Sequence, residues 1–208
     1  MKKSNIIPII QADIFARQNI GTTEERQVLL EQVLKAKVEN PQGIDHTNPG
    51  CWRDRVIYDN TQWLVNEIRS MAFELLEFYQ QKDPIFRKTT QKENQHFIIN
   101  TWTNVNEPGS TNSLHHHSGV SFACVYYLQG TDTGRLVFRQ PGIIFDHSNP
   151  KSPFSHHTSY APEDGDLIMW PSWMPHEVMY NESDRQRINM AFNIELVDES
   201  KMPTGEVK

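Results

Sequence analysis

Residues 111–120 read TNSLHHHSGV and place three histidines side by side, His115, His116 and His117. Neutral imidazole is the commonest metal ligand among protein side chains, so this triplet is a candidate metal site. Successive side chains of a β-strand point to opposite faces, so on a strand His115 and His117 would share one face and His116 would point away. Two of the three histidines can therefore bind one ion, and a further ligand must come from elsewhere in the sheet.

His176 is the best candidate for that further ligand. Seven of the nine histidines of the chain lie between residues 115 and 176, and His176 follows the turn WPSWMP (170–175) at the start of an expected strand. Two histidines from one strand and a third from a distant strand give a facial metal site with open coordination positions. We therefore expect His115, His117 and His176 to hold a metal ion.

Residues 142–161 contain Pro, Ser and Asn, three histidines and no hydrophobic periodicity. We interpret them as an irregular insertion in which His147, His156 and His157 are solvated. Long irregular loops in compact domains are usually functional or disordered, so this insertion is a candidate lid or substrate loop.

Arg187 begins a segment in which charged or polar residues alternate with apolar ones. Arg187, Asn189, Ala191 and Asn193 share one face of the expected strand, and an apolar series beginning at Ile188 shares the other. An inward-pointing arginine can clamp a carboxylate through two charge-assisted hydrogen bonds, and leaving it buried without a partner would be unfavourable. The partner is either an anionic ligand or a structural Asp or Glu.

Two helices are expected to precede these strands. Thr22 and Glu25 form a capping box that opens a helix reaching about Val38, and a second helix runs from about Thr61 to Tyr79. After residue 95 the hydrophobic period changes to two. In the segment HFIINTWTNVN, Trp102 and Asn104 lie on one face of the expected strand, and Phe97 and Val105 lie on the other.

Strands that follow helices without a βαβ alternation indicate an antiparallel fold. We predict a mainly β protein with N-terminal helices and a double-stranded β-helix (jelly-roll, cupin-like) core. Residues 1–95 would form a helical flank that packs on the barrel, and residues 96–198 would form the catalytic core, within one structural domain overall.

Composition excludes several classes of protein. The net charge is −6 and no basic block is present, which argues against nucleic-acid binding. The two cysteines, Cys51 and Cys124, exclude a disulfide framework and a CxxC motif. No uncharged run suits a bilayer span, and the start MKKSNIIPII lacks the features of a signal peptide. A soluble protein of the cytoplasm is the default expectation.

Several motifs together resemble known families. Gly109-x5-His115-x-His117 and Gly165-x5-Pro171-x-Trp173-x2-His176 are similar to the two motifs of cupin-type barrels. More specifically, the chain resembles the putative 2OG-Fe(II) oxygenase family, within the iron- and 2-oxoglutarate-dependent dioxygenases. The residues that carry this resemblance are WTNVN (102–106), NSLHHH (112–117), VYYL (125–128), GDLIMWPSWMPHEV (165–178) and RINMAFN (187–193), with a looser match of the N-terminal region CWRDR…WLVNEI, which we interpret as helical.

The resemblance implies Fe(II) and 2-oxoglutarate as cofactors. It implies that His115, His117 and His176 hold the iron and that Arg187 binds the distal carboxylate of 2-oxoglutarate, with Asn189 alongside. Further contacts to the cosubstrate are implied for Asn104 and for Tyr126 or Tyr127. Trp102 and Trp173 are candidate substrate contacts.

His117 departs from the wider superfamily, in which this ligand position usually carries Asp or Glu. Either the iron has three imidazole ligands, or His117 lies outside the coordination sphere. Glu177 is a poor replacement, because it would point to the opposite face from His176.

The implied activity is an oxygenase, most simply a hydroxylase, that couples oxidative decarboxylation of 2-oxoglutarate by O2 to oxidation of a C–H bond. A cupin-like metalloenzyme that does not use 2-oxoglutarate is an alternative that the three histidines favour, although the cupin glutamate is absent beyond His117. A non-catalytic jelly roll is a third hypothesis. The prime substrate stays open, as does a homodimer.

Overall fold

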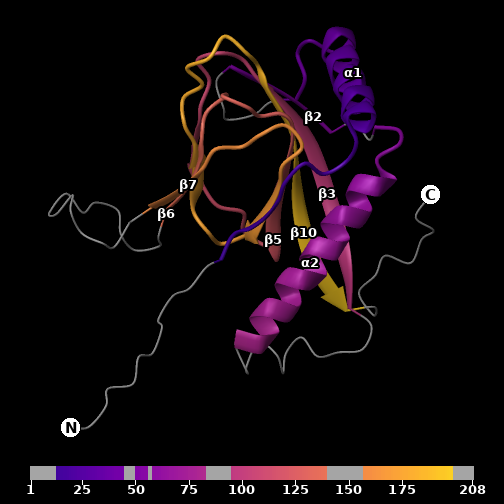
Figure 1. Ribbon diagram of the computed structural model, residues 1–208, viewed down its shortest axis with the longest axis vertical. Coiled ribbons are helices and arrows are strands. Elements are labelled where there is room, and N and C mark those ends of the chain that lie inside the picture. The colour runs from indigo at the N-terminus through magenta and orange to yellow at the C-terminus, as the bar shows by residue number, and fades with distance from the viewer. Residues whose placement is uncertain (1–12, 45–49, 56–57, 83–94, 140–156, 199–208) are drawn as a thin grey trace, which may run out of the picture.

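The computed structural model describes residues 13–44, 50–55, 58–82, 95–139 and 157–198. Within them the chain forms two antiparallel sheets and two helices (Figure 1). No described helix has the length and apolar character needed to cross a membrane.

The larger sheet consists of six strands. They are β1 (Phe15–Arg17), β8 (Leu167–Pro171), β5 (Phe122–Gln129), β10 (Arg187–Asp198), β3 (Gln95–Asn106) and β2 (Cys51–Asp54), in that order across the sheet. The smaller sheet has four strands. They are β4 (Asn112–His115), β9 (His176–Val178), β6 (Leu136–Arg139) and β7 (His157–Tyr160), again in spatial order.

From β4 to β10 the chain passes back and forth between the two sheets, and all neighbouring strands are antiparallel. This arrangement is the predicted double-stranded β-helix, which is thereby confirmed. The two sheets face each other, so a residue on the inner face of either sheet points into the barrel.

The two helices cover the outer face of the larger sheet (Figure 1). Helix α1 (Thr23–Glu39) begins with the predicted capping box of Thr22 and Glu25, and α2 (Gln62–Lys82) extends three residues beyond its predicted end. The main core lies between these helices and the sheet. It contains residues of α2 such as Ile68 and Leu75 together with the outward-facing apolar residues of β3, β5 and β10.

Strand β10 shows the predicted division of its two faces. Ile188, Met190, Phe192 and Ile194 are buried in the core beneath the helices. The alternate residues point into the barrel, where Asn189 and Ala191 line a pocket. On β3, Trp102 and Asn104 share one face, as their period predicts, and this face lines the same pocket.

Residues 1–95 also contribute two strands that periodicity did not predict. Strand β1 pairs with β8 at one edge of the larger sheet, and β2 pairs with β3 at the other. The CWRD segment is therefore an edge strand and not part of a helical region. The division into a flank and a core at residues 95 and 96 stays a prediction.

The irregular insertion 142–161 lies mostly outside the described residues, and so do His147 and His156. Its last part is described and is regular, because residues 157–160 form β7, which pairs with β6 along its whole length. The interpretation of this part as irregular, including His157, was wrong. Strand pairing supplied backbone partners that the hydrophobic pattern did not indicate.

Candidate active site

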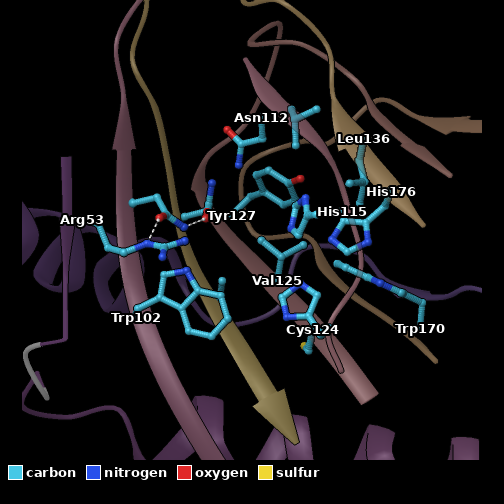
Figure 2. Close-up of a pocket in the computed structure, with 15 residues that line it drawn as sticks. Arg53, Trp102, Asn112, His115, Cys124, Val125, Tyr127, Leu136, Trp170 and His176 are labelled. Atoms are coloured by element: carbon cyan, nitrogen blue, oxygen red, sulfur yellow. Dashed lines mark hydrogen bonds between the residues drawn. The ribbon is translucent and has the colours of Figure 1, made fainter. Parts of the chain in front are cut away.

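Three histidines converge at the mouth of the barrel. The ligand nitrogens of His115, His117 and His176 all lie within 4.8 Å of one another. The ring centroids are 4.3 Å apart for His115 and His176, 5.1 Å for His117 and His176, and 5.2 Å for His115 and His117. Figure 2 shows His115 and His176 side by side. The cluster predicted from sequence spacing therefore forms, across the register pair of β4 and β9.

His117 does not lie on the strand that presents His115, although strand alternation suggests that it would. Strand β4 ends at His115, so His116 and His117 lie beyond it. The backbone N–H of His117 donates to the carbonyl of Ser172 at 2.9 Å, which fixes His117 against the turn between β8 and β9. His116 is exposed. The predicted pair of inward histidines is present, although the strand that was expected to present both is too short.

Each of the three imidazoles directs its Nδ1 atom at an oxygen. His115 Nδ1 is 2.8 Å from the carbonyl oxygen of Ser113, His176 Nδ1 is 3.0 Å from that of Met174, and His117 Nδ1 is 2.6 Å from Oδ1 of Asn193. An oxygen of this kind only accepts, so each Nδ1 carries the hydrogen and donates. Each Nε2 then keeps a free lone pair, which is the arrangement of metal-binding histidines with an outer hydrogen-bond partner. The cluster fits a divalent metal ion.

Asn193 is a residue that sequence reasoning placed on the inner face without giving it a role. Replacement of Asn193 by Ala should weaken metal binding by about 10- to 100-fold, because His117 loses the acceptor that fixes its tautomer and its ring orientation. Isothermal titration with Fe(II) under anaerobic conditions measures this change. Asn100→Ala is the matched control, since Asn100 is the exposed partner of Asn193 in the register of β3 and β10 and should leave the affinity unchanged. Equal affinities in both variants would contradict the role of Asn193.

Burial keeps two of the three histidines in their neutral form. Burial, with a smaller contribution from nearby His115, lowers the pKa of His117 to about 4 and that of His176 to about 3. Both side chains are therefore neutral at neutral pH, and only a neutral imidazole has a lone pair for a metal.

These shifts make the metal-free protein sensitive to mild acid. In the unfolded chain both histidines have a pKa of about 6.5 and take up protons earlier than in the folded protein. The free energy of unfolding should therefore fall as the pH drops below about 6.5 towards the folded pKa values. The measurement is the melting temperature of metal-free protein at about pH 7.5 and about pH 5, above the range in which ordinary carboxylates titrate. In His176→Gln the decrease should be smaller, and an equal decrease in both proteins would refute this origin.

The histidine cluster opens into a pocket that is connected to solvent. The lining residues come from both sheets and include the three histidines, and no Asp or Glu is among them. They are Arg53, Trp102, Asn104, Asn112, His115, His117, Cys124, Val125, Tyr127, Leu136, Trp170, His176, Val178, Asn189 and Ala191. A pocket without carboxylates favours an anionic ligand.

Arg187 lies directly behind Asn112, fully buried at 0% exposure. Its Nη1 donates to the carbonyl of Thr133 at 2.9 Å, its Nη2 donates to Oδ1 of Asn112 at 3.4 Å, and its Nε has no partner among the described residues. No described carboxylate forms a salt bridge with it, so the structural Asp or Glu that was the alternative partner is not found there. Burial lowers the pKa of Arg187. The guanidinium is a buried cation whose hydrogen bonds are incomplete.

The two candidate tyrosines lie on opposite faces of β5. Tyr127 lines the pocket, near Arg187. Tyr126 is directed towards the helices, and its hydroxyl donates to the carbonyl of Ile20 at 2.8 Å. Of the two alternatives, Tyr127 is therefore the one that faces the pocket, because neighbouring residues of a strand point to opposite faces.

Among the remaining candidates, Asn104 and Asn189 face the pocket and are joined by a hydrogen bond of 3.0 Å. Trp102 also lines the pocket, and its ring is stacked at 5.9 Å from that of His117. Trp173 is 44% exposed in the turn after β8 and is not among the residues that line this pocket, so a contact with the substrate stays a prediction.

Sequence reasoning missed Asn112 and Arg53. Asn112 accepts a hydrogen bond from Arg187, and a signal for it was available, because it lies in the same short strand as His115. Arg53 enters the pocket from β2, which was not recognised as a strand, so no pattern pointed to it.

Comparisons with known proteins agree with this geometry. Residues 100–193 match the model of a family described as "Putative 2OG-Fe(II) oxygenase". This segment contains all three histidines of the cluster and Arg187. No curated protein matches the chain.

Solved structures share the fold at low sequence identity. A prolyl-4-hydroxylase of Pseudomonas putida is 14% identical, with a TM-score of 0.58 over 88% of this chain and 91% of that chain. HygX of Streptomyces hygroscopicus, solved with nickel and 2-oxoglutarate bound, is 11% identical, with a TM-score of 0.53 over 88% and 82%. The carbocyclase SnoK of nogalamycin biosynthesis is 10% identical, with a TM-score of 0.63 over 92% and 84%. These proteins support the fold and differ in their reactions.

Proposed function

We propose that this chain is an oxygenase of the 2OG-Fe(II) family, whose model matches residues 100–193, that His115, His117 and His176 are its iron ligands, and that Arg187 anchors its cosubstrate. The family uses Fe(II) and 2-oxoglutarate, with O2 as the second cosubstrate. When bound, Fe(II) and 2-oxoglutarate would activate O2, which is the oxidant both for the decarboxylation of 2-oxoglutarate to succinate and carbon dioxide and for the oxidation of the substrate.

The observation that carries the ligand assignment is the direction of the three imidazoles. All three Nδ1 atoms donate to oxygens, and the ligand atoms of the cluster lie within 4.8 Å of one another. A chance group of histidines on a surface would have no reason to place an acceptor at Nδ1 of each ring. All three imidazoles therefore have the same tautomer, with the hydrogen on Nδ1 and the free lone pair on Nε2.

Arg187 is suited to the distal carboxylate of 2-oxoglutarate. Its planar fork is buried without a described carboxylate, and the long contact from Nη2 to Asn112 is easily exchanged for a charge-assisted bond. The hydroxyl of Tyr127 can donate to the same carboxylate, since Tyr127 lines the pocket near Arg187. When the carboxylate binds, the side-chain amide of Asn112 must rotate so that its oxygen leaves Nη2 of Arg187. Its NH2 group can then donate to the anion.

The three neutral ligands leave the iron with its full double positive charge, whereas an Asp or Glu ligand would reduce it. In this pocket, without carboxylates in its lining, the dianion 2-oxoglutarate supplies the compensating negative charge. The unusual ligand set therefore suits an anionic cosubstrate.

His117 occupies the position that the superfamily usually gives to a carboxylate, and this makes a direct test available. His117→Ala should lower the affinity for Fe(II) by at least about tenfold, because one ligand is lost together with its outer partner. His117→Asp should recover part of the affinity, since a carboxylate oxygen is also an iron ligand. Anaerobic titration with Fe(II) measures both. If neither substitution changes the affinity, His117 is not a ligand.

We propose hydroxylation of a C–H bond as the reaction, with the substrate on the Trp102 side of the pocket. The relatives in fold include a prolyl-4-hydroxylase and a carbocyclase, so a common architecture supports more than one outcome. Trp102 lines the pocket and has no part in the proposed binding of the metal or the cosubstrate.

The experiment that tests the function is turnover without a prime substrate. Purified protein with added Fe(II) and 2-oxoglutarate in air should release succinate slowly, and removal of iron by a chelator should stop the release. Tight metal binding without any binding or turnover of 2-oxoglutarate would instead favour a cupin-like metalloenzyme. Protein that takes up no stoichiometric metal would refute both.

A further inference from the structure

A second arginine, Arg53, lines the pocket on the wall opposite the histidine cluster. It comes from the edge strand β2 and is half-buried. Figure 2 shows Arg53 and Trp102 on one side of the cavity and His115 and His176 on the other. The proposed roles of the three histidines and Arg187 leave this cation unused.

The guanidinium of Arg53 has few contacts. Its Nε donates to Oδ1 of Asn104 at 3.2 Å, and its Cζ lies 5.2 Å from the centroid of the Trp102 ring. It forms no salt bridge with any carboxylate in the described part of the chain, and no described acceptor takes a hydrogen bond from Nη1 or Nη2. Burial lowers the pKa of Arg53, Cys51 opposes this shift, and the like charge of Arg55 adds to it.

The position of Arg53 is fixed by neighbours that also reach the rest of the site. Asn104 is held by a hydrogen bond of 3.0 Å to Asn189, and this leaves Oδ1 of Asn104 directed at Nε of Arg53. The Trp102 ring that faces the guanidinium is also stacked at 5.9 Å from His117. The guanidinium of Arg53 and the ring of His117 therefore both lie against Trp102, which connects the free nitrogens of Arg53 to the metal site.

We infer that Arg53 binds a carboxylate of the prime substrate, so that the substrate is an organic acid oxidised at a carbon near its anionic group. The inference rests on the proposed function, since it assigns Arg187 to the cosubstrate and leaves Arg53 for the substrate. One planar guanidinium with two free parallel donors matches one carboxylate. A phosphate would call for several cationic or backbone donors, and none of the other residues that line this wall is cationic.

The test uses short acids and a metal that supports no turnover. Protein is loaded with Zn(II) and saturated with 2-oxoglutarate, and calorimetry records both binding steps. Propanoate or its uncharged isostere propanamide is then added up to about 100 mM, which is above the millimolar range expected for a single anchoring contact. The indole N–H signal of Trp102, assigned with Trp102→Phe, reports binding by NMR.

Propanoate should shift the Trp102 signal and saturate, and propanamide should not. Arg53→Gln should weaken propanoate binding by at least about tenfold and leave the affinity for 2-oxoglutarate within about twofold. Arg53→Lys keeps the charge without the fork and should fall between the two. Arg69→Gln is the matched control, because Arg69 is exposed on helix α2 outside the pocket and should behave as the unaltered protein.

Three results would overturn the inference. The first is the absence of any NMR response to propanoate. The second is a response that persists in Arg53→Gln because the acid binds the metal. The third is a loss of 2-oxoglutarate affinity in Arg53→Gln as large as its loss of propanoate affinity. The third would make Arg53 the anchor of the cosubstrate. Failure of the proposed function is seen separately, as absent binding of Zn(II) or 2-oxoglutarate before any propanoate is added.

Discussion

His176→Ala is expected to lower the affinity for Fe(II) by at least about 100-fold and to abolish iron-dependent release of succinate. His176 is the most buried of the three histidines, at 4% exposure, and both its ring neighbours in the cluster lie within 5.1 Å. Loss of an outer hydrogen-bond partner alone commonly costs about 10- to 100-fold in metal affinity, so loss of the ligand itself should exceed that range. The two remaining imidazoles cannot define a facial site.

The measurement is anaerobic calorimetric titration with Fe(II), accompanied by a succinate assay on the same preparations. His116→Ala is the matched control, because His116 is exposed, lies between two proposed ligands in sequence and does not belong to the cluster. Its affinity should remain that of the unaltered protein. His176→Ala removes a buried ring, so circular dichroism must first show that the variant is folded. A folded His176→Ala protein that still binds Fe(II) with undiminished affinity would exclude His176 as a ligand.

The sequence was informative wherever one face of a strand differs chemically from the other. Strands β3 and β10 each have an apolar face towards the helices and a polar face towards the pocket, so a period of two separated Trp102, Asn104 and Asn189 from the apolar residues of the core. The capping box at Thr22 likewise predicted the start of α1, because it depends only on residues three apart.

Strand β5 shows why alternation could not choose between two tyrosines. Residues from Phe122 to Leu128 are all buried, because one face packs on the helices and the other lines the barrel. A strand buried on both faces carries no polar and apolar contrast in its sequence. The resemblance left Tyr126 and Tyr127 as alternatives, and the three-dimensional structure was needed to show that Tyr127 faces the pocket.

Arg53 and His117 illustrate a second limit, which is that strand ends depend on distant partners. Strand β2 has four residues and exists because it pairs with β3, some fifty positions further along the chain, so its own pattern is too short to detect. Strand β4 ends at His115 because its pairing with β9 ends there, and His117 is held by a backbone bond to Ser172 instead. Contacts of this kind are set by the closed barrel and leave no local signature.

Arg187→Met is expected to weaken 2-oxoglutarate binding by at least about 30-fold while leaving the metal-free protein as stable as before or more stable. The lost interaction is a buried pair between a guanidinium and a carboxylate, and truncation of one partner of such a pair typically costs 2–5 kcal/mol, or about 30-fold and more. Without its ligand, Arg187 is fully buried, forms no salt bridge with a described carboxylate and leaves Nε unpartnered. Replacing such a charge by an apolar side chain of similar length is often neutral or stabilising.

These two effects have opposite signs, and this separates cosubstrate binding from folding. The melting temperature is measured with the metal alone and then with saturating 2-oxoglutarate, since a ligand that binds only the folded state raises it. The unaltered protein should gain stability from 2-oxoglutarate, and Arg187→Met should gain almost none. Arg185→Met is the control, because Arg185 is exposed two residues earlier and should retain the full gain. The contrary result is a lower stability of the metal-free Arg187→Met protein with an unchanged affinity for 2-oxoglutarate. In that case the guanidinium stabilises the fold through its hydrogen bonds to Thr133 and Asn112, and another residue anchors the cosubstrate.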